Sequence, residues 1–327
     1  MTGTAGATAY PSHPAERDAW IVSRRAPRRA PRRAMDAEQP YACFVEDEVD
    51  ASGAARSVAT VFLTNRECPF RCLMCDLWQN TLEESVPSGA IARQIDVALA
   101  ALPAAAVIKL YNSGSFFDHR AIPPGDYPEI ARRVSGFRRV IVECHPSFVG
   151  PDVERFRDLL HGDLEVAMGL ETAHSAVLAR LNKRMTLESY AEASGRLRSM
   201  GIASRAFVLV QPPFLPVDEA AEWAVRSAAF AFDHGAGAVS LIPVRGGNGA
   251  LDALAESGEF APPRLATLEA AFAGALALAR GRVFADTWDL GRFSHCPACL
   301  DARSARLRAM NLAQQWMPRV RCEACDD

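Results

Sequence analysis

The sequence predicts an α/β fold in which parallel strands alternate with helices. Short runs of apolar and β-branched residues, typical of buried strands, recur along the chain, and each is followed by a loop and a helical pattern. Strands that alternate with helices of this length form parallel βαβ units. The chain has 327 residues, 49% hydrophobic and 23% charged, so it is large and apolar enough to bury a substantial core.

Six strands of this kind follow one another in order. They comprise residues 57–63, 107–111, 140–143, 164–168, 204–210 and 238–242. The predicted helices comprise residues 90–102, 127–135, 153–160, 187–200 and 217–234. In parallel sheets, ligands bind beyond the carboxyl ends of the strands. We therefore expect the functional residues in the loops that follow the strands.

The loop after the first predicted strand contains three closely spaced cysteines. Cys68, Cys72 and Cys75 have the spacing C-x3-C-x2-C. Iron–sulfur clusters are held by cysteine thiolates, and a cubane normally takes four of them. Three cysteines without a nearby fourth would leave one iron open to a ligand that is not protein. The alternative is that the three thiolates form part of a structural zinc site.

Four more cysteines form a second group near the C-terminus. Cys296 and Cys299 form one C-x2-C pair, and Cys322 and Cys325 form another after 22 residues. Paired C-x2-C motifs indicate a structural zinc site with four thiolate ligands. Four thiolates also suit an auxiliary 4Fe–4S cluster, and the spacing does not separate the two alternatives. Residues 302–316, between the pairs, are predicted to be helical.

The use of cysteine also indicates a compartment. Seven of the nine cysteines fall into these two groups, which favours metal binding over a disulfide framework. Such thiols must stay reduced, so we expect a cytoplasmic protein. The sequence has no run of 18 apolar residues, so we expect no membrane-spanning helix. The net charge of -3 gives no global argument for a polyanionic partner.

Residues 1–40 differ in composition from the rest of the chain. They are rich in Ala, Pro, Arg, Ser and Thr without apolar periodicity, and residues 23–33 form a basic run punctuated by proline. We predict a disordered tail, either simply solvated or serving as an electrostatic arm for RNA. The expected organisation is a tail over residues 1–40, an α/β core over 41–285 and a metal-binding segment over 286–327.

The cysteine motif, the strand before it and the aromatic Trp78 after it together resemble the signature of the radical S-adenosylmethionine (SAM) superfamily. This resemblance implies a partial (β/α)6 barrel and a 4Fe–4S cluster held by the catalytic residues Cys68, Cys72 and Cys75. It implies that the open iron binds SAM and that flavodoxin or ferredoxin donates an electron. The cofactor would supply a 5′-deoxyadenosyl radical that abstracts a substrate hydrogen. The expected enzyme is a lyase or a transferase.

The resemblance also implies that loops after later strands bind SAM. Residues 112–115 lie where radical SAM proteins place a segment that faces the methionine amino group, and Gly114 would permit close approach. The same segment would also suit a simple turn. The expected SAM-binding residues are Asn112, Ser113, Gly114, Ser115, Glu143, Glu171, Lys183, Arg184 and Arg245.

Charged residues on these loops have complementary expected roles. Glu143 and Glu171 could bind the ribose hydroxyls or the ammonium group of SAM, although a lone Glu at a strand end is often a helix cap. Lys183 and Arg184 could pair with the SAM carboxylate. Thr186, just ahead of a predicted helix, also has the character of an N-cap.

Other loop residues are candidates for contact with the adenosine or the substrate. Residues 245–249 contain three glycines, which suits a backbone lying against the adenine or ribose. Tyr111, His145 and Arg245 are expected to face the cavity and contact substrate. For His145, a purely structural role is an equal alternative.

A closer resemblance narrows the branch. Residues 109–118, residues 169–173 and the terminal cysteine pairs resemble the radical SAM subunit of archaeosine synthase and, more distantly, the radical SAM domain of the Elongator catalytic subunit. The archaeosine reaction implied is radical cleavage of a lysine adduct on a 7-deazaguanine base of tRNA. The expected substrate is therefore a modified tRNA base, with a partner subunit, or else a small metabolite. A different alternative is a non-catalytic Fe–S or zinc protein that binds nucleic acid.

Overall fold

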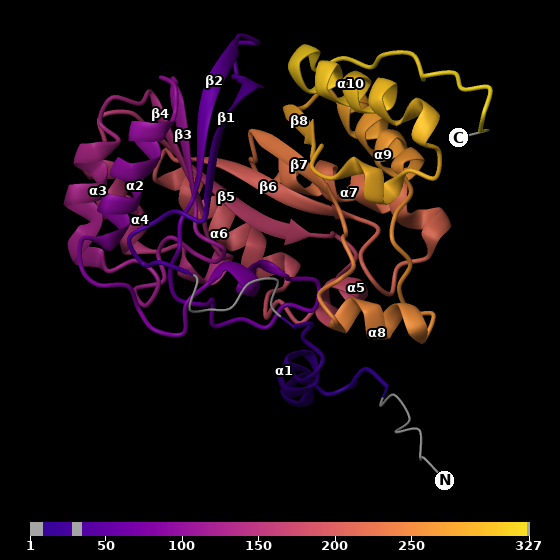
Figure 1. The fold of residues 1–327 in the computed structure, drawn as a ribbon, viewed down its shortest axis with the longest axis horizontal. Helices are drawn as coiled ribbons and strands as arrows, with labels where there is room; N and C mark the ends of the chain where they lie inside the picture. Colours follow the sequence, from indigo (N-terminus) through magenta and orange to yellow (C-terminus); the bar gives the residue numbers. More distant parts are fainter. Residues whose placement is uncertain (1–8, 28–34, 326–327) are drawn as a thin grey trace.

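A single curled sheet of eight strands forms the centre of the protein (Figure 1). The computed structural model describes residues 9–27 and 35–325. The strands lie side by side in chain order: β1 (Ala42–Val49), β2 (Ala55–Phe62), β3 (Val107–Tyr111), β4 (Arg139–Glu143), β5 (Asp163–Glu171), β6 (Ala203–Val210), β7 (Ala238–Pro243) and β8 (Arg282–Ala285).

The six strands predicted from the sequence are β2 to β7, and they run parallel. The sheet has one further strand at each edge, because β1 pairs antiparallel with β2 and the short β8 pairs parallel with β7. The charged residues Glu46, Asp47 and Glu48 hide β1 from a search for apolar runs. The predicted partial α/β barrel is thus confirmed, with two strands more than expected.

Helices cover the outer face of the curled sheet, as parallel crossovers require (Figure 1). The helices of the described chain are α1 (Pro14–Ser23), α2 (Ala90–Ala101), α3 (Tyr127–Arg133), α4 (Pro151–Leu159), α5 (Ser175–Arg180), α6 (Leu187–Ser199), α7 (Ala220–Asp233), α8 (Ala250–Glu256), α9 (Leu265–Ala277) and α10 (Pro297–Ala313). The expected cap of α6 is present, since Thr186 and Ser189 exchange reciprocal hydrogen bonds. Within the described residues, no helix is both long and apolar enough to span a bilayer.

Four aromatic residues line the inside of the curled sheet, and we call them the inner wall: Phe44, Phe62, Tyr111 and Phe207. Their rings meet in sequence, with centroid distances of 5.9 Å between Phe44 and Phe62 and 6.1 Å for the next two pairs. All four side chains are half-buried. The residues next to them within β2, β3 and β6 are buried on the opposite face, which the helices cover. The inner wall therefore faces an accessible interior.

Ion pairs fill the same interior nearer the amino ends of the parallel strands. Arg205 of β6 donates from Nε to Glu165 of β5 (2.8 Å) and also pairs with Glu48 of β1 on the far side of the sheet. Lys109 of β3 lies 2.8 Å from Glu48. Burial opposes ionisation of Glu48, but Arg205 and Lys109 outweigh it and hold the pKa of that carboxyl well below its usual range. This charged floor closes one end of the interior.

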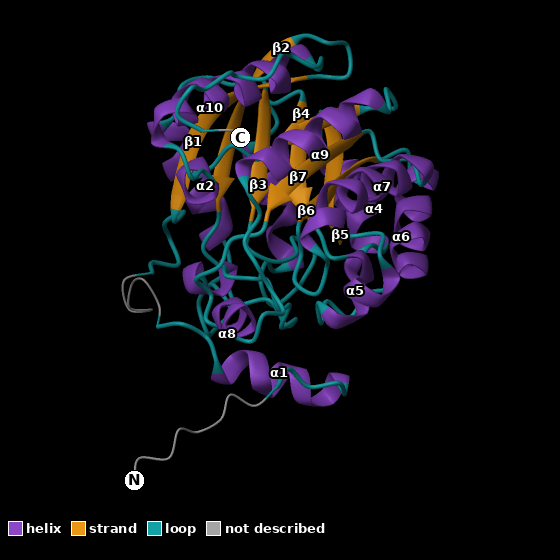
Figure 2. Cartoon of the chain, turned by 90° about the vertical axis from the view of Figure 1, so that its right-hand side faces the viewer, coloured by secondary structure: helices purple, strands orange, loops and turns teal. Residues whose placement is uncertain are grey.

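The predicted disordered tail is wrong for part of its length. Residues 14–23 form helix α1, and Tyr10, Trp20 and Ile21 are buried in the main core. The helix begins with Pro14 and has only ten residues, of which Trp20 and Ile21 are the buried apolar ones. So short an apolar pattern cannot be recognised among the surrounding polar residues. Figure 2 shows α1 beyond the loops at the carboxyl ends of the strands. Residues 1–8 and 28–34 lie outside the described residues, and the second of these ranges contains most of the basic run at 23–33.

The C-terminal segment protects the edge of the sheet. Helix α10 packs against β1 and β8. It begins at Pro297, earlier than predicted, because Cys296 caps it and proline suits the first turn. Two of its amide side chains imitate a neighbouring strand: Asn311 exchanges hydrogen bonds with the backbone of Ala285 (2.8 and 2.9 Å), and Gln314 does so with Val283 (2.7 and 2.8 Å). The edge of β8 is therefore not free to pair with another chain.

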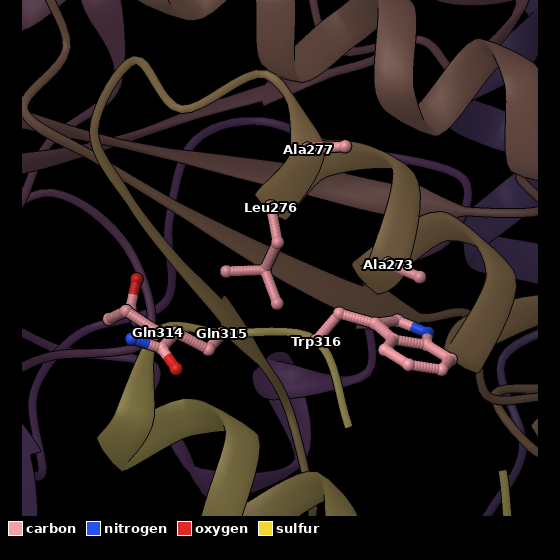
Figure 3. A pocket seen from close by; sticks show the side chains of 6 residues that line it. All are labelled: Ala273, Leu276, Ala277, Gln314, Gln315 and Trp316. Carbon is pink, nitrogen blue, oxygen red and sulfur yellow. The ribbon is translucent and has the colours of Figure 1, made fainter. Parts of the chain in front are cut away.

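A shallow pocket of about 290 Å³ lies between α9 and the end of α10 (Figure 3). It is lined by Ala273, Leu276, Ala277, Gln314, Gln315 and Trp316. None of these belongs to the residues expected to carry chemistry. The candidate site is instead at the loop end of the sheet.

Candidate active site

The three cysteines of the predicted cluster lie in the loop that follows β2. We call residues 63–76 the cysteine loop. Cys68, Cys72 and Cys75 are half-buried free thiols in it. Burial raises the pKa of all three, that of Cys72 to about 12 even though the positive charge of Lys183 opposes the shift. A metal bound here must therefore displace protons from these thiols.

The segment after β3 lies directly against the cysteine loop. A Cβ atom on Gly114 would lie 3.3 Å from the Cβ of Cys68, which is a tight contact, so glycine allows the two loops to approach. Ser113 has a positive φ of 54°, and its Oγ lies 3.0 Å from the hydroxyl of Tyr41. The segment expected to face SAM therefore lies against the cysteine loop.

Asn112 and Glu143 form the adjoining part of the site. Asn112 is fully buried, and neither its amide oxygen nor its amide nitrogen has a hydrogen-bond partner. The carboxylate of Glu143 accepts from the backbone N–H of Asn112 (3.1 Å). Burial raises the pKa of Glu143 to about 7, although backbone N–H groups of residues 112–114 partly oppose the shift. An unpartnered buried amide indicates that a polar ligand is expected beside it.

Glu171 and Lys183 form a buried ion pair of 2.5 Å. Gly169 makes room for it, because a Cβ there would lie only 2.4 Å from the Lys183 ammonium. Glu171 is the last residue of β5 and has a positive φ of 66°, a backbone state that costs free energy in a residue other than glycine. The fold thus brings together two residues that the sequence placed on separate loops.

Two predicted SAM contacts lie apart from this group. Arg184 is exposed and pairs with Asp18 of α1 (3.1 Å). Arg245 pairs with Asp286 (2.9 Å) and donates to the carbonyl of Trp288 (2.6 Å), on the β8 side of the sheet. Both guanidinium groups therefore serve protein contacts.

His145 is structurally satisfied. Its Nε2 lies 2.9 Å from the carbonyl of Lys183, and its Nδ1 lies 2.8 Å from the hydroxyl of Ser147. Its ring stacks on Phe70 of the cysteine loop at 4.0 Å, and its backbone N–H donates to Ser115 Oγ (2.8 Å). Burial lowers the pKa of His145 to about 3, so the ring is neutral. Of the two roles open to this residue, the structure favours the structural one.

Sequence reasoning missed several residues of the interior. Tyr41 and Phe44 belong to the start of β1 or precede it, and Phe207 reaches the interior from β6. The alternation of Phe44 with Glu46 and Glu48 along one face of β1 was the available signal.

The residues fit a cluster with three protein thiolates and a SAM ligand. Within the described residues, the tight ligand group consists of the terminal cysteines and includes none of the loop thiols. The neighbouring Asn112 offers an unused donor and acceptor. Glu143 and the Lys183–Glu171 pair supply charges of both signs beside it, as the ammonium and carboxylate of an amino acid require.

The four terminal cysteines form a second, much tighter site. Their sulfur atoms all lie within 4.8 Å of one another. Cys296 Sγ lies 3.8 Å from Cys322 Sγ, and Cys299 Sγ lies 3.7 Å from Cys325 Sγ. Cys296 occupies the N-cap position of α10, where the backbone N–H of Cys299 lowers the pKa of its thiol to about 7. The predicted four-cysteine grouping is confirmed.

Comparison with known proteins gives relatives of both sequence and fold. No family model matches the chain. The uncharacterized protein MJ0550 of Methanocaldococcus jannaschii is 24% identical over 226 residues, which cover 64% of this chain and 62% of that protein. Archaeosine synthase subunit beta of Methanosarcina acetivorans is 27% identical over 166 residues, covering 49% of this chain and 48% of that protein. The chain is related to the radical SAM superfamily.

The fold comparison agrees with this relation. The archaeal Elp3 of Methanocaldococcus infernus superposes with a TM-score of 0.50 at 13% identity, over 68% of this chain and 58% of that one. The chain thus matches about half to three fifths of the length of these three proteins. Its fold is similar to that of Elp3, and its cysteine loop follows β2, where the sequence resemblance expects the cluster.

Proposed function

We propose that this chain is a radical SAM enzyme. The observation that carries the proposal is the grouping of three thiols, an unpartnered Asn112 and the Lys183–Glu171 pair at the carboxyl ends of parallel strands. Ligands of parallel α/β sheets bind at this end. Burying charge is costly, so the buried Lys183–Glu171 pair beside the thiols supports a site for a charged ligand.

The protein's own groups have separable tasks. Cys68, Cys72 and Cys75 would hold three irons of a 4Fe–4S cluster. When bound, the cluster and SAM supply a single electron and a 5′-deoxyadenosyl radical that removes a hydrogen atom from the substrate. Glu143 attracts the SAM ammonium group once it is ionised, and Lys183, oriented by Glu171, attracts the carboxylate.

Anaerobic reconstitution tests this proposal. Protein loaded with iron and sulfide, reduced with dithionite and given SAM is expected to release 5′-deoxyadenosine. A protein that takes up the cluster and shows a normal reduced spectrum yet cleaves no SAM would be the non-catalytic Fe–S protein instead.

The inner wall supports a planar heterocycle as the substrate group. Phe44, Phe62, Tyr111 and Phe207 present aromatic faces and edges to an accessible interior. Base–aromatic stacking contributes about 1–3 kcal/mol per base. The relative named archaeosine synthase subunit beta favours a modified tRNA base over a small metabolite.

Substrate pools discriminate these alternatives. Unmodified and modified tRNA fractions, and a tRNA-free metabolite fraction, are each added to the reconstituted enzyme. We expect a modified tRNA fraction to raise the yield of 5′-deoxyadenosine, and Phe207→Leu to weaken that stimulation about tenfold while leaving the basal yield unchanged. Stimulation by the metabolite fraction alone would replace the tRNA assignment.

The terminal site suits a single zinc ion. Zinc binds thiolates tetrahedrally at about 2.3 Å, which places the sulfurs about 3.8 Å apart. The measured separations are 3.8 and 3.7 Å. A 4Fe–4S cluster interposes its own iron and sulfide atoms and needs thiolates that are farther apart.

Metal analysis tests the zinc assignment. A variant with Cys68, Cys72 and Cys75 all replaced by Ala is expected to keep one zinc and no iron. Iron retained by this variant after reconstitution would place an auxiliary cluster at the terminal cysteines.

A further inference from the structure

Two buried asparagines hold the backbone carbonyls of the cysteine loop. Asn182 Nδ2 donates to the carbonyl of Arg71 (2.8 Å). Asn248 Nδ2 donates to the carbonyls of Leu73 (2.8 Å) and Cys75 (3.3 Å). Each asparagine is only 2% exposed, and the two come from different loops, one after α5 and one directly before α8. The stretch around Cys72 and Cys75 is therefore fixed from two sides.

Peptide geometry links these carbonyls to the thiols. In a planar trans peptide, the C=O of one residue and the N–H of the next point in opposite directions. Holding the Arg71 carbonyl toward Asn182 therefore turns the N–H of Cys72 away from Asn182. That N–H slightly lowers the pKa of the Cys72 thiol, because its positive end faces the sulfur. Hydrogen bonds to ligand sulfurs raise the reduction potential of an iron–sulfur cluster, since they stabilise its more negative reduced state.

Helix α1 completes the arrangement. Asp18 Oδ1 accepts the second hydrogen of Asn182 Nδ2 (2.6 Å). At the end of the same segment, the backbone N–H of Ala26 donates to the carbonyl of Asn248 (3.0 Å). Both views show α1 beyond the loop end of the sheet, close to α8 (Figures 1 and 2). The segment that the sequence predicts to be a tail therefore supports both asparagines.

We propose that Asn182 and Asn248 are positioning residues that hold the cysteine loop in the conformation that presents its thiols to the cluster. This inference rests on the proposed function, because it concerns the loop that would carry the cluster. It assigns the two asparagines no contact with SAM or substrate. The proposal predicts that replacing either asparagine alters the uptake, spectrum and reduction potential of the cluster in a protein that still folds.

The variant Asn248→Asp separates this role from helix capping. Asn248 Oδ1 also accepts from the N–H of Leu251 and so caps α8 (2.8 Å). Aspartate keeps an oxygen that can accept from the Leu251 N–H. Its second oxygen replaces Nδ2 and cannot donate to the carbonyls of Leu73 and Cys75. Asn248→Ala loses both functions. We expect both variants to show the same altered cluster, and only Asn248→Ala to unfold at a lower denaturant concentration as well, because it also loses the acceptor for the Leu251 N–H.

The expected result is a change in the reduced cluster under identical reconstitution. Iron uptake, the electron paramagnetic resonance spectrum and the midpoint potential are measured for full-length protein. We expect a more negative potential, a changed spectrum and about tenfold weaker cluster retention or SAM cleavage, the range for residues that support metal ligands. Asn182→Asp is expected to behave in the same way, because its added oxygen faces Asp18 and the Arg71 carbonyl.

Asn311→Asp is the matched control. Asn311 likewise donates from Nδ2 to a backbone carbonyl and accepts at Oδ1, but it does so at the edge of β8. It is expected to lose stability without any change in the cluster spectrum. If Asn248→Asp matches the wild type in spectrum and potential, the positioning role is wrong while SAM cleavage by the wild type still supports the proposed function. If the wild type takes up no cluster, both proposals fall.

Discussion

The two cysteine sites of this protein differ in how closely their sulfurs lie and in what surrounds them. The terminal thiols lie within 4.8 Å of one another, and helix α10 directs backbone N–H groups at one of them. The loop thiols are more widely placed, and burial raises the pKa of each. Tight, complete ligand sets are typical of structural zinc, whereas an incomplete set beside buried charges suits a reactive cluster.

The two sites also differ in what holds them. The terminal pairs depend on the start of α10 and on the tail that follows it. The cysteine loop depends on residues from four other parts of the chain: Gly114, Asn182, Asn248 and His145. A structural site can be built locally, whereas a site that must also bind a cofactor is assembled by the whole fold.

The largest expected effect comes from the loop cysteines. Cys72→Ala removes one of three cluster ligands, so we expect iron uptake at this site and all formation of 5′-deoxyadenosine to be lost, with zinc content unchanged. Cys43→Ala is the control, because Cys43 is a free thiol of β1 outside both groups. Product formation by Cys72→Ala, measured by chromatography, would contradict the cluster assignment.

Breaking the buried ion pair has the next largest effect. Lys183→Met leaves Glu171 buried without its cation, and we expect a loss of about 3–5 kcal/mol in the free energy of unfolding together with weaker SAM binding. Arg303→Met similarly breaks a buried pair with Glu269 (2.8 Å), but beside the terminal site. It should destabilise the protein less, because Arg306 still pairs with Glu269 (3.2 Å), and it should leave SAM affinity in calorimetric titration unchanged. Equal loss of SAM affinity in both variants would mean that the effect is only structural.

Removing one terminal ligand should spare the cluster. Cys322→Ala is expected to release zinc and lower Tm by about 3–5 °C, equivalent to roughly 2–3 kcal/mol for a protein of this size. Iron content and the rate of SAM cleavage per cluster should stay at wild-type levels at low temperature. A proportional loss of iron would show that the terminal cysteines hold an auxiliary cluster.

The smallest expected effect is a pH dependence at Glu143. Burial raises the pKa of its carboxyl from 4.5 to about 7, so the folded state holds a proton that the unfolded state releases. The stability of the ligand-free protein should therefore decrease as pH rises between these values and then level off. SAM affinity should increase over the same interval, because the ionised carboxylate attracts the ammonium group. Glu143→Gln should remove both dependences, as measured by denaturant unfolding and by titration; unchanged slopes would contradict this role.

Much of the fold could be read from local sequence. The parallel strands β2 to β7 are apolar runs that are buried on the face covered by the helices. Such runs can be identified from the local sequence, without knowing which strand each one pairs with. β1 could not be recognised in this way, because its charged Glu48 pairs with Arg205, Lys109 and Arg282 from strands distant in sequence. Helix α1 could not be predicted from local sequence for a similar reason, since Trp20 and Ile21 are buried only by packing against the folded core.

The sequence by itself determined the two metal-binding motifs, because the number and spacing of the cysteines indicate how many thiolates can bind at one site. It also placed Glu171 and Lys183 at the loop end of the sheet. Only the tertiary structure decided that these two residues pair, that Arg184 and Arg245 serve protein contacts, and that Asn182 and Asn248 hold the cysteine loop. The physical reason is that a motif specifies ligands along the chain, whereas hydrogen bonds and ion pairs depend on groups that meet only when the sheet curls.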